Sequence, residues 1–194
     1  MKILIAVPTF ETVMPETFKS IYDLNKCGHD LAFEFIKGYD VAKARNEIAY
    51  KTATEGYDYV LMVDSDMIIP KNTLECMLEG GPEICLGVYP RKNTKTGEAE
   101  LFKDNGIDFF DRYKYSELAD DRMEVKGGGF GCVLIKASVF GKMDYPWFKF
   151  EAYKDFTALS EDLYFCDRVT KIGMKVIADT RVRCGHATRG FQFE

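Results

Sequence analysis

Two carboxylates one residue apart follow the most apolar stretch of this chain. Asp64 and Asp66 flank Ser65, directly after the apolar run from Tyr59 to Val63. Carboxylates spaced in this way can face one divalent cation, and Mg²⁺ and Mn²⁺ prefer oxygen ligands and bridge readily to a diphosphate. An acidic turn held by Asx hydrogen bonds is the other interpretation. The position of the triplet in the fold distinguishes a cation site from a simple acidic turn.

A second pair of acids occurs near the C-terminal end of the sequence. Glu161 and Asp162 follow Ser160, a favoured N-cap residue, at the start of a predicted helix that reaches Ile172. Acids are common in a first helical turn because they complement the helix dipole. A carboxylate held there could also take a proton as a general base.

Histidine is scarce, since the chain has only two. His186 follows Gly185, whose small size leaves the backbone free to approach a cofactor, so His186 is either a metal ligand or a structural residue. His29 follows Gly28 at an expected helix end, where a surface or capping role fits.

The elements that must position these residues alternate between strand and helix. Strands are expected at 2–7, 31–37, 57–63 and 84–89, and helices at 15–27, 41–56 and 72–78. This alternation predicts a mostly parallel sheet, in which ligands bind beyond the carboxyl ends of the strands. Residues 64–66 stand at such an end.

The second half of the chain is less regular. Periodicity is weak from Arg91 to Lys126, and short strands are expected at 130–136, 175–178 and 182–184. The helix from Ser160 is expected to turn four residues inward, namely Leu163, Cys166, Val169 and Ile172. No repeat or linker divides the chain, so one α/β domain over 1–194 is predicted.

Composition excludes several classes of protein. A net charge of −5 argues against tight non-specific nucleic-acid binding. The apolar runs are too short for a transmembrane helix, and the N-terminus is typical of a strand rather than a signal peptide, so a cytoplasmic location is expected. Six scattered cysteines without a C-x-x-C pair are expected to be reduced and mostly buried.

Several motifs, taken in order, resemble those of GT-A-fold glycosyltransferases, in particular compact bacterial and phage-type members similar to family 2. They are Ala6-Val7-Pro8-Thr9, Ala44-Arg45-Asn46, Val63-Asp64-Ser65-Asp66, the glycine run from Gly127 to Cys132, Pro146-Trp147-Phe148, and Ser160-Glu161-Asp162 with the later His186. The resemblance implies a single GT-A-like domain, with a Rossmann-like nucleotide-sugar-binding half over 1–90 and a smaller α+β acceptor half over 91–194.

The resemblance also implies a donor site. It places the nucleoside against Pro8, Thr9, Glu11 and Asp40. An aspartate can accept a hydrogen bond from a uracil N–H, so Asp40 favours a UDP-sugar; a turn residue or helix N-cap is the alternative. Arg45 would reach the base or the diphosphate, unless it is a solvated helix charge.

The implied metal is Mn²⁺ or Mg²⁺, with Asp66 as direct ligand and His186 as a further ligand. Asp64 would contact the ribose, or the metal through water, and Ser65 belongs to the same donor-binding loop. In similar inverting enzymes the aspartate of the Glu-Asp pair is the base, which assigns that role to Asp162 and a supporting role to Glu161.

Acceptor recognition has the weakest support in the sequence, and the acceptor itself is unknown. Gly128 and Gly129 could let the backbone approach sugar hydroxyls or could simply lead into a strand. Trp147 is the best aromatic candidate for acceptor contact, with the core as its alternative place. The charged segment 91–121 could contribute further contacts.

Three other functions remain as alternatives. A haloacid-dehalogenase-type phosphatase would carry its Asp-x-Asp on an early strand, whereas a full βαβα unit precedes Asp64 here. A nucleotidyltransferase would open with a glycine-rich basic loop, which Pro8-Thr9-Phe10-Glu11 is not. A non-catalytic sugar-nucleotide-binding protein is not excluded by any residue.

Overall fold

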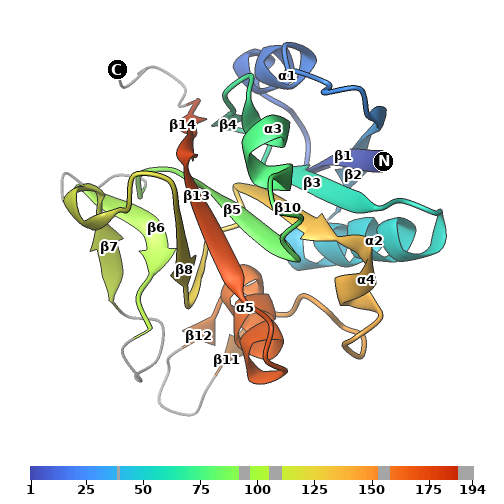
Figure 1. Ribbon diagram of the computed structural model, residues 1–194. Helices are drawn as coiled ribbons and strands as arrows, with labels where there is room; N and C mark the ends of the chain where they lie inside the picture. Colours follow the sequence, from blue (N-terminus) through green and yellow to red (C-terminus); the bar gives the residue numbers. More distant parts are fainter. Residues whose placement is uncertain (39, 92–96, 105–110, 153–157, 188–194) are drawn as a thin grey trace.

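The fold is built around one mixed central sheet. The computed structural model describes residues 1–38, 40–91, 97–104, 111–152 and 158–187 (Figure 1). The seven strands of the central sheet are β1 (Lys2–Thr9), β2 (Asp30–Lys37), β3 (Tyr59–Val63), β5 (Ile84–Val88), β8 (Arg122–Val125), β10 (Cys132–Lys136) and β13 (Val176–Arg183). Their spatial order is β2-β1-β3-β10-β5-β13-β8. Only β10 and β8 run against the other five strands of this sheet, which is therefore mostly parallel, as the sequence predicts.

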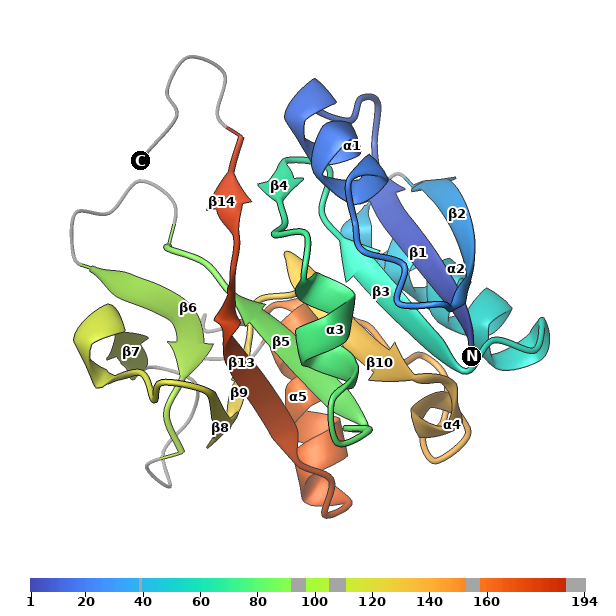
Figure 2. The same ribbon diagram turned by 45° about the horizontal axis from the view of Figure 1, so that its top comes forward.

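Helices cover both faces of the sheet (Figure 2). They are α1 (Pro15–Tyr22), α2 (Val41–Thr54), α3 (Thr73–Leu78), α4 (Ala137–Phe140) and α5 (Glu161–Lys171). Alternate residues of each strand point to opposite faces, so Leu4 and Ala6 pack with α2, α4 and α5, whereas Ile3 and Ile5 pack with α1 and α3. The apolar runs are continuous in sequence because both faces are buried.

The structure corrects two expectations for the helices, the end of α1 and the inward orientation of Ile172. Helix α1 ends at Tyr22 rather than Cys27, because the chain turns Leu24 into the core and Asn25 N–H donates to the Lys71 carbonyl, 2.9 Å away. Ile172 was expected to face inward, but it caps α5 and is 49% exposed. Phe165 takes a fully buried place on that helix instead.

The segment with weak periodicity contains regular structure. A small sheet forms from β7 (Arg112–Lys114), β6 (Glu98–Phe102) and β9 (Gly127–Gly128), and a short 3₁₀ helix, η1, covers Tyr115–Glu117. Of the charged segment 91–121, residues 92–96 and 105–110 lie outside the described residues. The strands expected at 175–178 and 182–184 are one strand, β13, with an irregularity between Asp179 and Arg183.

The two halves of the chain share the central sheet. β10 comes from the second half, yet it lies between β3 and β5 and pairs antiparallel with both. Two-residue strands complete the structure: β4 (Met67–Ile68) pairs with β14 (Gly185–His186), and β11 (Glu151–Ala152) pairs with β12 (Ala158–Leu159). The two halves expected from the sequence, 1–90 and 91–194, are therefore not separate sheets.

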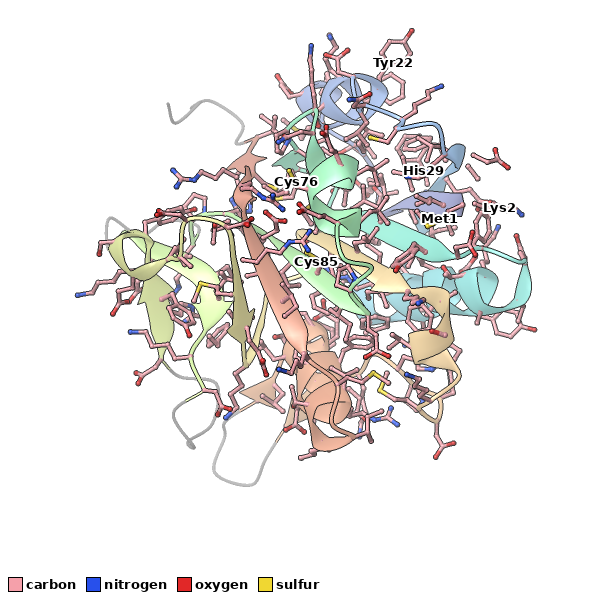
Figure 3. The ribbon with its side chains drawn as sticks, viewed as in Figure 1. Met1, Lys2, Tyr22, His29, Cys76 and Cys85 are labelled. Carbon is pink, nitrogen blue, oxygen red and sulfur yellow. The ribbon has the colours of Figure 1, made fainter. Side chains whose placement is uncertain are left out.

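The cysteines are free thiols, and five are buried; Cys27 alone is exposed. Figure 3 shows Cys85 within the central sheet and Tyr22 on the outer side of α1.

Within the described ranges, no helix has both the length and the apolar composition that crossing a bilayer demands.

Asn46 fixes α2 to the chain that precedes α5. Its Oδ1 accepts from Trp147 N–H at 3.0 Å and from Phe148 N–H at 3.2 Å, and its Nδ2 donates to the Phe148 carbonyl at 2.7 Å. All of these groups are buried, so the Asn46 amide provides the hydrogen bonds that water cannot provide to the backbone of Trp147 and Phe148.

We expect Asn46→Ala to lower the free energy of unfolding by roughly 2 to 4 kcal/mol, because it leaves two buried N–H groups without an acceptor. Urea unfolding measures the change. The matched control is Asn25→Ala, at an exposed position, and an equal effect of the two substitutions would contradict the anchoring role of Asn46.

Candidate functional site

A cavity of about 420 Å³ opens at the carboxyl ends of the parallel strands. Fifteen residues line it: Pro8, Thr9, Phe10, Gly38, Asp40, Val41, Ala44, Arg45, Asp64, Ser65, Asp66, Tyr89, Phe130, Glu161 and Asp162. The cavity thus crosses the sheet edge from β2 to β5, with the N-termini of α2 and α5 beside it. This is the edge at which open α/β sheets bind ligands.

The acidic triplet occupies the middle of this edge. Asp64 directly follows β3, and its N–H donates to the Gly131 carbonyl at 2.9 Å, which ties the triplet to the start of β10. Its carbonyl accepts from Met67 N–H at 3.0 Å, so the triplet turns directly into β4. Residues 64–66 form a turn whose side chains line the cavity, and the cation site stays a prediction.

Arg45 lies beneath the triplet and is 2% exposed. Its Nη1 donates to Glu161 Oε1 and its Nη2 donates to Asp64 Oδ1, the latter at 2.8 Å. The interpretation of Arg45 as a solvated helix charge is therefore wrong. Its guanidinium fork is occupied by the protein's own carboxylates, which corrects the expectation that it reaches out to a base or diphosphate. Instead, Arg45 joins the two acidic motifs, which are far apart in sequence.

Negative charge exceeds positive charge around the cavity. Asp64, Asp66, Glu161 and Asp162 line it, and Arg45 is the one cationic side chain among the described lining residues. Burial, together with the neighbouring Asp162 carboxylate, raises the pKa of Glu161 to about 7 against the opposing pull of Arg45. Burial likewise raises the pKa of Asp64, although Arg45 opposes it. A cation or a proton entering the cavity is stabilised by this excess.

Asp162 stands in the first turn of α5. Its Oδ1 accepts from Leu163 N–H at 2.8 Å and from the Ser160 hydroxyl, which fixes the carboxylate. In the part of the chain that the structure describes, no hydrogen bond involves Oδ2. Ser160 is the N-cap residue of α5, but its hydroxyl donates to Asp162 Oδ1 and accepts no hydrogen bond from a backbone N–H of the helix.

The residues expected to hold a nucleoside divide into two groups. Pro8, Thr9 and Asp40 line the cavity, whereas Glu11 lies in a neighbouring hollow of about 490 Å³ that shares Phe10 and Gly38 with it. Asp40 is the N-cap of α2, because its Oδ1 accepts from Lys43 N–H at 2.7 Å. The helix-cap interpretation is thus confirmed, and it places Asp40 at the β2 end of the cavity.

His186 is brought near the triplet by the pairing of β14 with β4. It stands opposite Met67, and Ala187 N–H donates to the Asp66 carbonyl at 2.7 Å. The His186 ring packs edge-on against Tyr89, with ring centroids 5.1 Å apart. No group of three or more His, Cys, Asp or Glu side chains is gathered for a metal ion within the described ranges.

The acceptor residues expected from the sequence do not line this cavity. A Cβ on Gly128 would stand 2.7 Å from the Glu100 carbonyl oxygen, and one on Gly129 would stand 2.1 Å from the Tyr89 hydroxyl. The glycines therefore make room for the protein's own chain rather than for a sugar. Trp147 is 8% exposed and donates its indole N–H to the Phe140 carbonyl, so it belongs to the core, which corrects its expected acceptor contact.

Sequence reasoning missed Tyr89 and Phe130. Both line the cavity at its β5 end. Tyr89 directly follows the apolar strand β5, so its position at the carboxyl end of a parallel strand was a signal that could have singled it out.

We expect the stability contributed by Glu161 to fall as pH rises from about 4.5 to 7. Its folded pKa is raised, so in this range the native state keeps a proton that the unfolded chain has lost. Urea unfolding at pH 5.0 and 7.5 should show wild type losing on the order of 1 to 3 kcal/mol relative to Glu161→Gln, which does not titrate. Glu75→Gln, on exposed α3 surface, is the control, and a pH-independent difference for Glu161→Gln would contradict the raised pKa.

Comparisons with known proteins bear on the fold. No family model matches the chain, and no curated protein matches its sequence. The solved structure of A197 from STIV superposes with a TM-score of 0.66 at 18% identity, over 96% of this chain and 85% of that one. TarS 1-349 from S. aureus gives 0.52 at 15% identity, over 93% of this chain and 58% of that one. The inositol-1-phosphate CTP transferase of T. maritima gives 0.44 at 13% identity, too loose a match for any inference. The first two likenesses support the expected GT-A-like α/β architecture.

Proposed function

We propose that this protein is a metal-dependent glycosyltransferase that takes a sugar from a UDP-sugar and passes it to an acceptor hydroxyl. The observation that carries the proposal is the gathering of Asp64, Asp66, Glu161 and Asp162 in one cavity at the carboxyl ends of β1, β3 and β5. Two motifs separated by almost a hundred residues form a single acidic site there. The GT-A-like fold is compatible with this chemistry but does not by itself establish it.

The cavity has the extent that a nucleotide sugar requires. Its lining passes from β1 to β5 across three strand intervals, which together span about 14 Å. A nucleoside bound at Pro8, Thr9 and Asp40 would place its diphosphate at the acidic triplet. The transferred sugar would then lie towards Tyr89 and Asp162.

The donor set at the triplet fits Mn²⁺ or Mg²⁺. Both ions take oxygen ligands, and Mg²⁺ is commonly held by one or two carboxylates together with substrate phosphates. Asp66 would hold the ion, Asp64 would support it directly or through water, and His186, which pairs with Met67 beside the triplet, would be a further ligand. The excess of carboxylates around Arg45 supplies the negative charge that a divalent ion needs. When bound, the ion would neutralise charge on the diphosphate.

The hydrogen bonds of Asp162 support its assignment as the base. Its Oδ1 is held by Leu163 N–H and by the Ser160 hydroxyl, which leaves Oδ2 for the acceptor. In the proposed reaction the acceptor oxygen forms a bond to the anomeric carbon as its proton passes to Asp162. The bond from that carbon to the diphosphate breaks, and its electron pair leaves with UDP. Attack from the face opposite the diphosphate inverts the anomeric configuration.

We expect UDP to bind in Mn²⁺ and to lose at least about tenfold in affinity in a chelator, because the acidic cavity repels a bare diphosphate. Asp66→Ala should lower the affinity in Mn²⁺ to the chelator value. Isothermal calorimetry with both proteins measures this. Asp120→Ala, an exposed aspartate outside the cavity, is the matched control. Equal UDP affinity in Mn²⁺ and in chelator would refute metal dependence.

We expect Asp162→Asn to reduce turnover by roughly 100-fold or more while leaving UDP-sugar affinity nearly unchanged, because the amide keeps the shape but cannot take a proton. Release of UDP is followed with water and with a panel of acceptor sugars. NMR of the product should show the anomeric configuration opposite to that of the donor. Retention would rule out the single displacement, and binding without turnover in any assay would favour a sugar-nucleotide-binding protein.

A further inference from the structure

Tyr89 occupies a fixed position at the β5 end of the cavity. The backbone of Tyr89 is fixed by a hydrogen bond, in which Glu100 N–H donates to the Tyr89 carbonyl at 3.0 Å. Its side chain is 7% exposed and lines the cavity. The edge-on contact with His186 fixes the ring on one side.

Two glycines form the slot that holds this ring. A Cβ on Gly129 would stand 2.1 Å from the Tyr89 hydroxyl oxygen, and one on Gly131 would stand 2.9 Å from the ring carbon that bears it. No side chain other than hydrogen fits at either position without moving the ring. Gly129, which was expected to approach a sugar, therefore helps to position a tyrosine instead.

Within the described residues, the hydroxyl of Tyr89 accepts one hydrogen bond and donates none. Gly131 N–H donates to its oxygen at 3.0 Å, and the carbonyl of the same Gly131 accepts from Asp64 N–H. One residue thus joins the hydroxyl to the acidic triplet. Among the residues that the structure describes, none accepts the hydroxyl proton. A phenol that is both held and lacking an acceptor is suited to donate to an oxygen of a bound ligand.

We infer that Tyr89 is a specificity-determining residue whose hydroxyl donates a hydrogen bond to a hydroxyl oxygen of the transferred sugar. The inference rests on the proposed function, since that function places the nucleoside at β1 and β2, the diphosphate at β3, and the sugar at β5. Tyr89 is at the β5 end, on the opposite side of the triplet from Asp40. It therefore contacts the sugar and not the nucleotide.

The test separates the sugar from the nucleotide. Wild type, Tyr89→Phe and the exposed control Tyr50→Phe are titrated calorimetrically with UDP, UDP-glucose, UDP-galactose and UDP-N-acetylglucosamine in Mn²⁺. Tyr89→Phe should bind the best of the three sugar nucleotides about two- to tenfold more weakly, the usual worth of one neutral hydrogen bond, and should bind UDP as wild type does. Tyr50→Phe should change neither.

Other outcomes have distinct meanings. If wild type binds but Tyr89→Phe weakens UDP as much as the sugar nucleotide, or weakens neither, the role of Tyr89 is overturned while the proposed function stands. If wild type binds none of the four ligands, the proposed function itself fails. A second measurement needs only wild type: deoxy analogues of the best-bound sugar are titrated, and one must bind two- to tenfold more weakly. Equal affinities for all of them would overturn the inference.

Discussion

The site depends on one buried charge. Arg45 donates to Asp64 and to Glu161, and without its guanidinium the buried Glu161 side chain would lose its cationic partner. Removing one partner of a buried charged group is costly, because the other is left without compensation. Arg45 therefore joins the end of β3 to the start of α5, and with them the proposed metal site to the proposed base.

Asn46, the next residue, provides a neutral counterpart to this arrangement. Its amide satisfies the backbone of Trp147 and Phe148, so the same turn of α2 holds both the acidic motifs and the chain that leads to α5. Two adjacent polar side chains thereby hold distant segments together inside the core. Buried polar groups of this kind favour one arrangement of the chain, since every alternative leaves them without partners.

The parts of the fold and of the candidate site that depend on a local sequence pattern could be predicted. The apolar run before Asp64 and the helix that starts after Ser160 are both present, and the acidic triplet stands at the expected sheet edge. Contacts between distant residues left no such signal: the partners of Arg45 are 19 and 116 positions away. The close packing of the chain against Gly128 and Gly129 was equally hidden, because such packing has no sequence period. For Trp147 the sequence left the core open as an alternative, and the structure confirms it.

The place of β10 has a consequence for how the chain folds. Strands β3 and β5 do not touch as neighbours; β10 separates them and pairs with both. During synthesis β3 and β5 leave the ribosome before β10, the strand that lies between them. The centre of the sheet therefore cannot form until residue 136 has emerged. Closure then depends on pairings between distant parts of the sequence, which slow folding. The cavity, which straddles β3 and β5, is consequently among the last features to form.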